Sequence, residues 1–162
     1  ERADGTSVGP PVAMNDVVIS RGRPPSMIAF DLTSAGLYVA SYRADGLIFA
    51  TPSGSTAYSL AAGGPILDPR MRAVVATPIS AHALSHRPLV LDADATLEAH
   101  LLDAAGPATL DVDGQLVAEL TMGDRVTLAP ASARYPLLTL ESLNPWKRLR
   151  DRLGWAGRFD ES

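Results

Sequence analysis

Short runs of alternating or β-branched apolar residues, separated by turn residues, recur along almost the whole chain and most constrain its fold. In the clearest of them, Ile28, Phe30 and Leu32 share one face, which is the period-two pattern of a half-buried strand. Strands are predicted at residues 12–20, 26–33, 37–43, 47–51, 73–79, 96–101, 109–113, 125–128 and 138–140. The runs at 47–51 and 73–79 are apolar throughout, which indicates strands buried on both faces.

Two stretches are predicted to be helical. Residues 56–62 lack helix breakers, follow serines able to cap a helix, and precede the Gly-Gly-Pro of residues 63–65. Near the end of the chain, Asn144 is a suitable cap and Pro145 suits the first helical position, while Gly154 ends the run.

Turn residues between the predicted strands favour antiparallel pairing. Asp113-Gly114 and Gly123-Asp124 have the composition of hairpin turns. No internal repeat or interior linker interrupts the pattern. The predicted fold is therefore mainly β: an antiparallel, two-sheet, sandwich-like domain with one short central helix and one C-terminal helix.

Composition narrows the class of protein. The 162 residues suffice for one domain but are short for two, so residues 1–162 are treated as one domain. The opening at Glu1 is polar and begins no element, which we interpret as the interior of a longer protein or a processed terminus. There is no bilayer-length apolar run and no signal pattern, so we expect a cytoplasmic protein without a membrane partner. The formal net charge of −4 argues against a nucleic-acid partner, and the absence of cysteine excludes disulfides and thiolate metal sites.

Residues 45–66 are the most informative segment. A buried strand leads into a loop of glycine and small hydroxyl residues, and that loop opens a helix. Helix N-termini present free backbone N–H groups, and glycine and serine let a ligand approach the backbone. Such a loop suits a phosphate, a ribose or an amide edge, with Asp45 and Tyr58 as further contacts. The alternative is that the loop only caps the helix.

The same segment resembles the long C-terminal signature of the NAD kinases, D-G-x-x-x-x-T-P-[ST]-G-S-T-A-Y-S-L-x-x-G-G-P. Shorter segments resemble other parts of that family in the same order, at residues 15–19, 82–90, 113–115 and 149–155. The resemblance spans essentially the whole chain. It implies the NAD-binding C-terminal domain of an NAD kinase, a phosphotransferase that phosphorylates the 2′-hydroxyl of NAD with ATP or polyphosphate to give NADP.

One family motif does not occur in these 162 residues. NAD kinases carry Gly-Gly-Asp-Gly in an N-terminal α/β domain, and its aspartate is regarded as the base that acts on the ribose hydroxyl. The resemblance therefore implies half of a composite active site. We expect no catalytic residue within this chain and no appreciable activity from the chain alone.

The resemblance also implies which residues line the NAD pocket: Asn15, Asp16, Asp45, Ser53, Thr56, Ala57, Tyr58 and Ala61. Asn15 and Asp16 match the pair that holds the ribose, a role that suits an amide and a carboxylate. Asp16 stands where Glu is commoner, and its shorter side chain favours a water-mediated contact. The structural alternatives are that this pair only interrupts an edge strand and that Tyr58 belongs to the core.

The family role implies further contacts within that pocket. Asp45 would accept from an amide or amine of the ligand, and Ser53 and Thr56 would hydrogen-bond adenine. The Ala57 backbone would contact the rest of the dinucleotide. Ala61 stands where many relatives have Ser, which removes a hydrogen bond of ~1 kcal/mol.

Several assignments stay open at this point. His82 and Arg87 lie in a matched segment, but each suits either a structural role or a ligand contact. No metal-ligand spacing is present, so Mg²⁺ is expected to be held mainly by substrate phosphates. The resemblance implies a homodimer or homotetramer.

Alternative functions are a non-catalytic nucleotide sensor, the β domain of a related lipid kinase, and an adhesion or carbohydrate module. The phosphoryl donor, the NAD or NADH preference and the oligomer size are not predicted.

Overall fold

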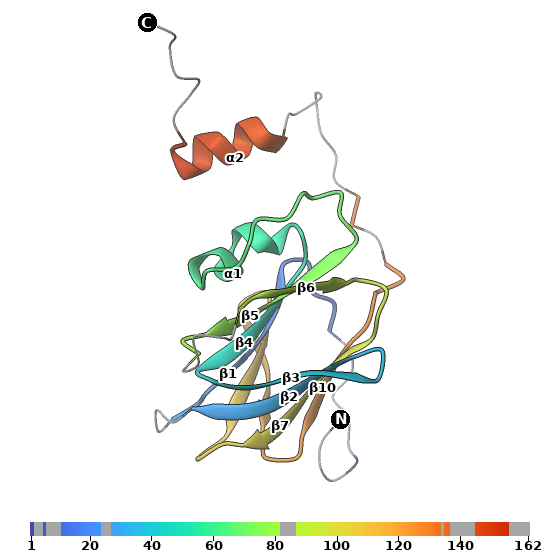
Figure 1. Cartoon of the computed structure of the whole chain (residues 1–162), viewed down its shortest axis with the longest axis vertical. Helices are drawn as coiled ribbons and strands as arrows, with labels where there is room; N and C mark the ends of the chain where they lie inside the picture. Colours follow the sequence, from blue (N-terminus) through green and yellow to red (C-terminus); the bar gives the residue numbers. More distant parts are fainter. Residues whose placement is uncertain are drawn as a thin grey trace, which may run out of the picture. The chain divides into compact units, whose positions relative to one another are not determined.

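The computed structural model describes residues 1, 5, 11–23, 27–81, 87–133, 135–136 and 145–155. The chain divides into two units, Glu1–Ser132 and Ala133–Ser162. The first unit is a pair of antiparallel sheets with a short helical segment (Figure 1). In the second unit, the described helix is α2 (Pro145–Leu153), which confirms the predicted C-terminal helix. No described helix has the length and apolar character needed to cross a membrane.

The two sheets of the first unit have six and four strands. The larger sheet has the order β6-β5-β4-β1-β8-β9, and the smaller one has the order β10-β7-β2-β3. The strands of the larger sheet are β1 (Asp16–Ser20), β4 (Gly46–Ala50), β5 (Ala73–Ile79), β6 (Leu89–Asp92), β8 (Ala108–Val112) and β9 (Gln115–Leu120). Those of the smaller sheet are β2 (Ile28–Ser34), β3 (Leu37–Ala44), β7 (Leu97–Asp103) and β10 (Arg125–Leu128). The predicted antiparallel two-sheet fold is confirmed.

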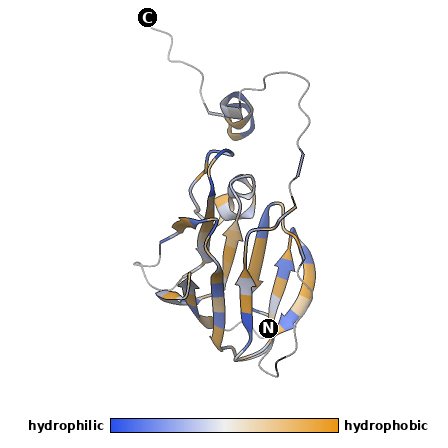
Figure 2. Cartoon of the chain, turned by 90° about the vertical axis from the view of Figure 1, so that its right-hand side faces the viewer, coloured by the Kyte–Doolittle hydropathy of each residue, from blue (hydrophilic) through white to orange (hydrophobic). Residues whose placement is uncertain are grey.

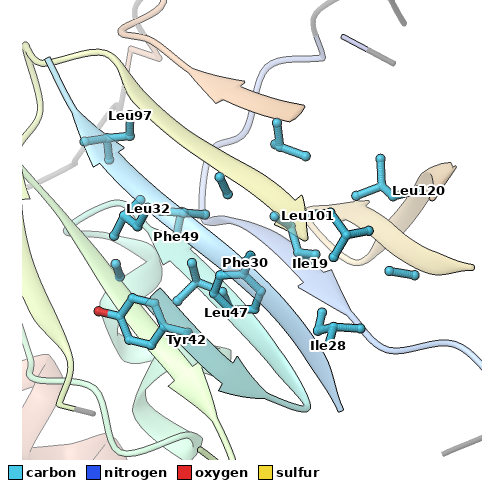
Figure 3. Packing of buried hydrophobic residues seen from close by; sticks show 14 residues of the cluster. Ile19, Ile28, Phe30, Leu32, Tyr42, Leu47, Phe49, Leu97, Leu101 and Leu120 are labelled. Carbon is cyan, nitrogen blue, oxygen red and sulfur yellow. The ribbon is translucent and has the colours of Figure 1, made fainter. Parts of the chain in front are cut away.

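Strand β4 lies between β1 and β5 and is buried along its whole length, as its continuous apolar run predicts. Its alternate residues enter two different apolar clusters. Leu47 and Phe49 join the main core between the sheets, where they pack with residues such as Phe30 (Figure 3). Ile48 and Ala50 join a smaller cluster on the other face of the large sheet. Both faces of the large sheet are therefore covered at its centre.

The main core combines apolar residues of both sheets, and Figure 2 shows hydrophobic residues concentrated on their strands. Ile28, Phe30 and Leu32 are almost completely buried, which confirms the predicted apolar face of β2. Phe30 stacks on Tyr42 of β3 with ring centroids 5.6 Å apart. Burial of side chains of this size contributes about 1.5–3 kcal/mol each, so this face anchors the smaller sheet.

One of the two predicted hairpin turns is confirmed and the other is wrong. Asp113 and Gly114 have φ angles of 47° and 77° and join β8 to β9, which pair with each other. Gly123-Asp124 instead carries the chain from β9 in the large sheet to β10 in the small one. The Asp124 carboxylate accepts from the Thr121 backbone N–H at 2.8 Å and so closes a local turn between the sheets.

Other boundaries also differ from the prediction. Strand β1 begins at Asp16 instead of residue 12, and strands β6 and β9 were not predicted. The strand predicted at 138–140 and the cap at Asn144 lie outside the described residues.

The helix predicted at 56–62 is a 3₁₀ turn, η1 (Gly54–Thr56), followed by the single turn α1 (Tyr58–Ala61). In Figure 1, α1 covers the face of the large sheet that is turned away from the small sheet.

Candidate functional site

A cavity of about 350 Å³ opens on the large sheet and is lined by Asn15, Asp16, Val18, Ser20, Ala57, Tyr58, Asp111, Asp113 and Gly114. Asp16, Val18 and Ser20 are alternate residues of β1 and therefore share one face. Because Val17 and Ile19 between them pack in the main core, the cavity lies on the outer face of the sheet. Three segments that are distant in the sequence meet there: the start of β1, the end of β8 with its turn, and the start of α1.

Four of the eight predicted site residues line this cavity, namely Asn15, Asp16, Ala57 and Tyr58. Tyr58 is 47% exposed, so the alternative of a core aromatic is wrong. Asn15 and Asp16 precede and begin a strand that is paired on both sides, so they do not interrupt an edge strand. The structure thus brings three of the matched segments, at residues 15–19, 45–66 and 113–115, to one cavity.

The other four predicted site residues do not line it. Asp45 lies at the opposite end of the β1–β4 pair, where its carboxylate is 2.8 Å from the Arg21 Nε. Ser53, Thr56 and Ala61 are exposed on and beside η1 and α1. Their contacts with a ligand remain predictions.

The hydroxyl residues of the central loop make internal hydrogen bonds. Thr51 Oγ1 donates to the Met14 carbonyl at 2.7 Å and accepts from the Gly54 N–H at 3.1 Å. Ser55 Oγ donates to the Pro52 carbonyl and accepts from the Leu67 N–H. Ser53 and Ala57, the cap residues of η1 and α1, make no side-chain cap hydrogen bond, so the predicted serine cap is wrong. The four-residue α1 is also too short to support the phosphate site that a longer helix N-terminus offers.

This loop and the segment before β1 are fastened to each other. The Thr51 N–H donates to the Asn15 carbonyl at 2.8 Å. Gly54 is packed so closely on Asn15 that an added Cβ would lie 2.7 Å from the Asn15 Cα and still closer to its carbonyl group. The position of the Asn15-Asp16 pair relative to the start of α1 is therefore set by backbone contacts.

The β8–β9 turn holds the same segment from the other side. The Asp113 carboxylate accepts from the backbone N–H groups of Met14 at 2.7 Å, Asn15 at 2.7 Å and Asp16 at 3.0 Å. In return, the Asp113 N–H donates to the Asp16 carbonyl at 3.0 Å. Sequence reasoning treated Asp113-Gly114 as a simple turn and missed these contacts. The available signal was the resemblance of residues 113–115 to a family motif.

The lining of the cavity is rich in acceptors. Among the described residues, it contains three carboxylates, Asp16, Asp111 and Asp113, and no lysine, arginine or histidine. Asp111 accepts from the Thr109 Oγ1 at 3.1 Å, and that hydroxyl is also 2.8 Å from the Ser20 Oγ. Such a lining favours ligand hydroxyl and amine donors and disfavours phosphate inside the cavity.

The surroundings of Asp16 raise the pKa of its carboxyl group, whereas those of Asp113 lower the pKa of its carboxyl group. Asp16 is only 7% exposed, and its carboxylate has no hydrogen-bond partner among the described residues. Burial, and secondly the charge of Asp113, raise the pKa of Asp16. Partial burial acts in the same sense on Asp113, but its three backbone N–H donors outweigh that effect and lower the pKa of Asp113. Asp16 is thus a buried acceptor without a donor in the part of the chain that the structure describes.

No metal-ligand cluster and no basic side chain among the described residues belongs to this cavity. Within the described part of the chain, no three His, Asp or Glu side chains are grouped to hold a metal ion. Arg87 is exposed and does not line the cavity. His82 lies outside the described residues.

The buried Ser59–Thr77 pair fixes α1 on the sheet. Both side chains are fully buried, and their hydroxyl oxygens are 2.9 Å apart. We expect Thr77→Val to lower the free energy of unfolding by about 1–3 kcal/mol, because it leaves the Ser59 hydroxyl buried without its partner. Urea unfolding measures this change.

The matched control is Thr127→Val in β10, where the side chain is exposed and the expected change is within about 0.5 kcal/mol. The double variant Ser59→Ala/Thr77→Val is expected to lose less than the sum of its single changes. Equal losses at Thr77 and Thr127 would contradict the assigned role of the pair.

Comparison with known proteins gives one consistent family. Residues 14–140 match the family model described as the ATP-NAD kinase C-terminal domain. The chain is 40% identical to the NAD kinase of Rhodopirellula baltica over 156 residues, which are 96% of this chain and 50% of that protein. It is 38% identical to the NAD kinase of Hahella chejuensis over 161 residues, which are 99% of this chain and 54% of the other. The chain therefore spans about half the length of these relatives.

Two solved structures are similar to the fold. The crystal structure of yeast NADH kinase complexed with NADH has a TM-score of 0.78 and 31% identity, and the match covers 93% of this chain and 46% of the other. An NAD kinase from Archaeoglobus fulgidus in complex with ATP has a TM-score of 0.65 and 28% identity, over 74% of this chain and 46% of that one.

Proposed function

Since the chain belongs to the NAD kinase family through its ATP-NAD kinase C-terminal domain, we propose that it forms the dinucleotide-binding part of an enzyme that phosphorylates the 2′-hydroxyl of NAD. The donor would be ATP or polyphosphate and the product NADP. The relatives solved with NADH and with ATP support nucleotides as the ligand class. The names of these relatives favour neither the lipid-kinase nor the sensor alternative.

The buried carboxylate of Asp16 carries this proposal. Asp16 is a largely buried residue, and its carboxylate has no hydrogen-bond partner among the described residues, which is unfavourable; a ribose hydroxyl would supply a donor. Asn15 beside it offers both a donor and an acceptor, and the half-exposed ring of Tyr58 offers a surface for stacking. A ribose contact is thus the interaction that this arrangement supports best.

The cavity suits one nucleoside of the dinucleotide. Its volume of about 350 Å³ lies at the small end of ligand pockets. The three carboxylates of the lining disfavour the pyrophosphate, which would therefore lie outside. Asp45, Ser53, Thr56 and Ala61 would then contact parts of the ligand that extend beyond the cavity.

The rest of the active site would come from outside these residues. The catalytic base is expected on the N-terminal domain, in the Gly-Gly-Asp-Gly motif of the family. Mg²⁺ would be held mainly by substrate phosphates and would neutralise their charge during transfer. A cytoplasmic homodimer or homotetramer remains the proposal for the assembly, and exposed apolar side chains such as Leu37 and Leu116 are available for contacts between copies.

Calorimetric titration of the full chain with NAD tests the site. We expect Asp16→Asn to weaken NAD binding by about 1–3 kcal/mol, because the ligand hydroxyl then donates to a neutral amide oxygen in place of a charged carboxylate. The fold should be unharmed, since the substitution removes a buried charge and keeps the side-chain shape.

The matched control is Thr127→Ala, which lies on the small sheet, outside every matched segment and outside the cavity lining. It should leave NAD binding unchanged. Equal weakening by both substitutions, measured on folded protein, would remove the case for a specific site.

A further inference from the structure

Asp113 differs from the other residues of the cavity in what its carboxylate does. Both of its oxygens are engaged with the main chain, Oδ2 with the Met14 N–H and Oδ1 with those of Asn15 and Asp16. We infer that Asp113 is a positioning residue, whose carboxylate fixes the backbone of residues 14–16 so that Asn15 and Asp16 face the bound nucleoside. This inference rests on the proposed function of the cavity.

The turn itself does not require an aspartate. Ala35 and Gly36, which join β2 to β3, have φ angles of 49° and 76°, nearly the same as those of Asp113 and Gly114. An alanine therefore occupies the equivalent position of a turn with the same conformation. The side chain of Asp113 is explained by its three hydrogen bonds and not by the geometry of the turn.

The carboxylate also adds a negative charge to an acidic cavity. It lies close enough to Asp16 to raise the pKa of that residue, which is unfavourable for two ionised groups. Hydrogen bonds from N–H groups to a carboxylate are among the stronger ones in proteins, and three of them outweigh this repulsion. Asp113 thus holds the segment at the start of β1 despite the charge that it brings.

Asp113 affects ligand binding mainly through the backbone of residues 14–16, and less by direct contact with the ligand. A carboxylate has about four acceptor positions, and three are taken by the backbone of residues 14–16. Asp16, in contrast, is aligned by these bonds while its own carboxylate stays without a described partner. Removal of Asp113 should therefore loosen the contact between Asp16 and the ligand without deleting it.

The experiment compares two variants of the full chain, Asp113→Gly and Ala35→Gly. Both place glycine at the first position of the same kind of turn, but only the first removes the carboxylate. We expect Asp113→Gly to weaken NAD binding at least tenfold and Ala35→Gly to leave it unchanged, in calorimetry at a temperature where both are folded. Asp113→Asn, whose amide oxygen still accepts from the backbone, should recover part of the affinity.

Two further measurements separate positioning from stability. Amide hydrogen exchange should accelerate at Met14, Asn15 and Asp16 in Asp113→Gly and not in Ala35→Gly. The loss of NAD affinity on acidification should also move to lower pH, because Asp16 no longer faces the charge of Asp113. The titratable groups lining the cavity with Asp16 are Asp111, Asp113 and Tyr58, and only Asp113 is changed.

The possible results separate a failure of the proposed function from a failure of the positioning role of Asp113. If the unmodified chain binds no NAD, the proposed function fails, whereas the exchange rates still report whether Asp113 fixes residues 14–16. If the unmodified chain binds NAD and Asp113→Gly binds it equally well with the same pH profile, the positioning role is overturned. If Asp113→Gly does not fold, Asp113→Ala provides the same comparison, because alanine already occupies the equivalent turn position at Ala35, and unchanged affinity and exchange in it would overturn the role.

Discussion

Replacing Gly54 by alanine is expected to destabilise the fold by about 3 kcal/mol, at the upper end of what overpacking costs. The new Cβ would lie 2.7 Å from the Asn15 Cα and closer still to the Asn15 carbonyl carbon and oxygen. Those atoms belong to the main chain, and the Asn15 carbonyl is bonded to the Thr51 N–H. The loop before η1 must therefore separate from the start of β1, and NAD affinity should fall with it.

Urea unfolding and an NAD titration on the folded fraction measure the two effects. Gly36→Ala is the control, because its φ of 76° is unfavourable for alanine, whereas nothing lies within 4 Å of the added atom. It should cost only about 1–2 kcal/mol and leave binding intact. A smaller loss of stability for Gly54→Ala than for Gly36→Ala would show that the close approach is not rigid.

A polypeptide of these 162 residues is expected to form NADP at less than a hundredth of the rate of an intact NAD kinase. The proposed role of the cavity is limited to ligand contacts, and the catalytic base that the family resemblance implies belongs to a motif that these residues lack. General-base help is typically worth about 10²–10⁴-fold, and the positioning of the donor phosphate adds to that loss. The matched relatives are about twice as long as this chain.

A coupled NADP assay compares this polypeptide with the Rhodopirellula baltica relative under the same conditions. NAD binding by calorimetry serves as the control for a folded chain. Turnover within tenfold of the intact enzyme would contradict a composite site and would place a base within these residues.

The centre of the fold could be predicted from the sequence because its strands carry strong local patterns. Strand β4 is apolar throughout, and β2 alternates with its buried residues on one face. Strands β6 and β9 escaped prediction because they lie at the two edges of the large sheet and leave apolar residues exposed, such as Leu116 at 62%. Gly123-Asp124 could be identified as a turn, but local residues do not determine which sheet receives the next strand.

Only some of the residues that line the cavity could be predicted from the sequence, because others are brought there by strand pairing. Asn15, Asp16, Ala57 and Tyr58 follow from their place in family signatures. Asp111 joins them because β8 pairs with β1 in a register that sets Val18 opposite Asp111, a pairing between segments far apart in the sequence. The composition of a loop also does not separate a hydroxyl that meets a ligand from one that, like Ser55, bonds the loop itself.

The division of apolar residues between two clusters affects which parts of the molecule can unfold separately. The smaller cluster, Val18, Ile48, Ala50, Leu67, Ala73 and Val75, does not share its residues with the main core. Partial unfolding confined to α1 and the chain leading to β5 would therefore break this cluster and leave the sandwich closed. Tyr58 lies on that separable layer, whereas Asp16 lies on a central strand. A ligand held by both would join this layer to the central strand, and would protect the layer against such partial unfolding.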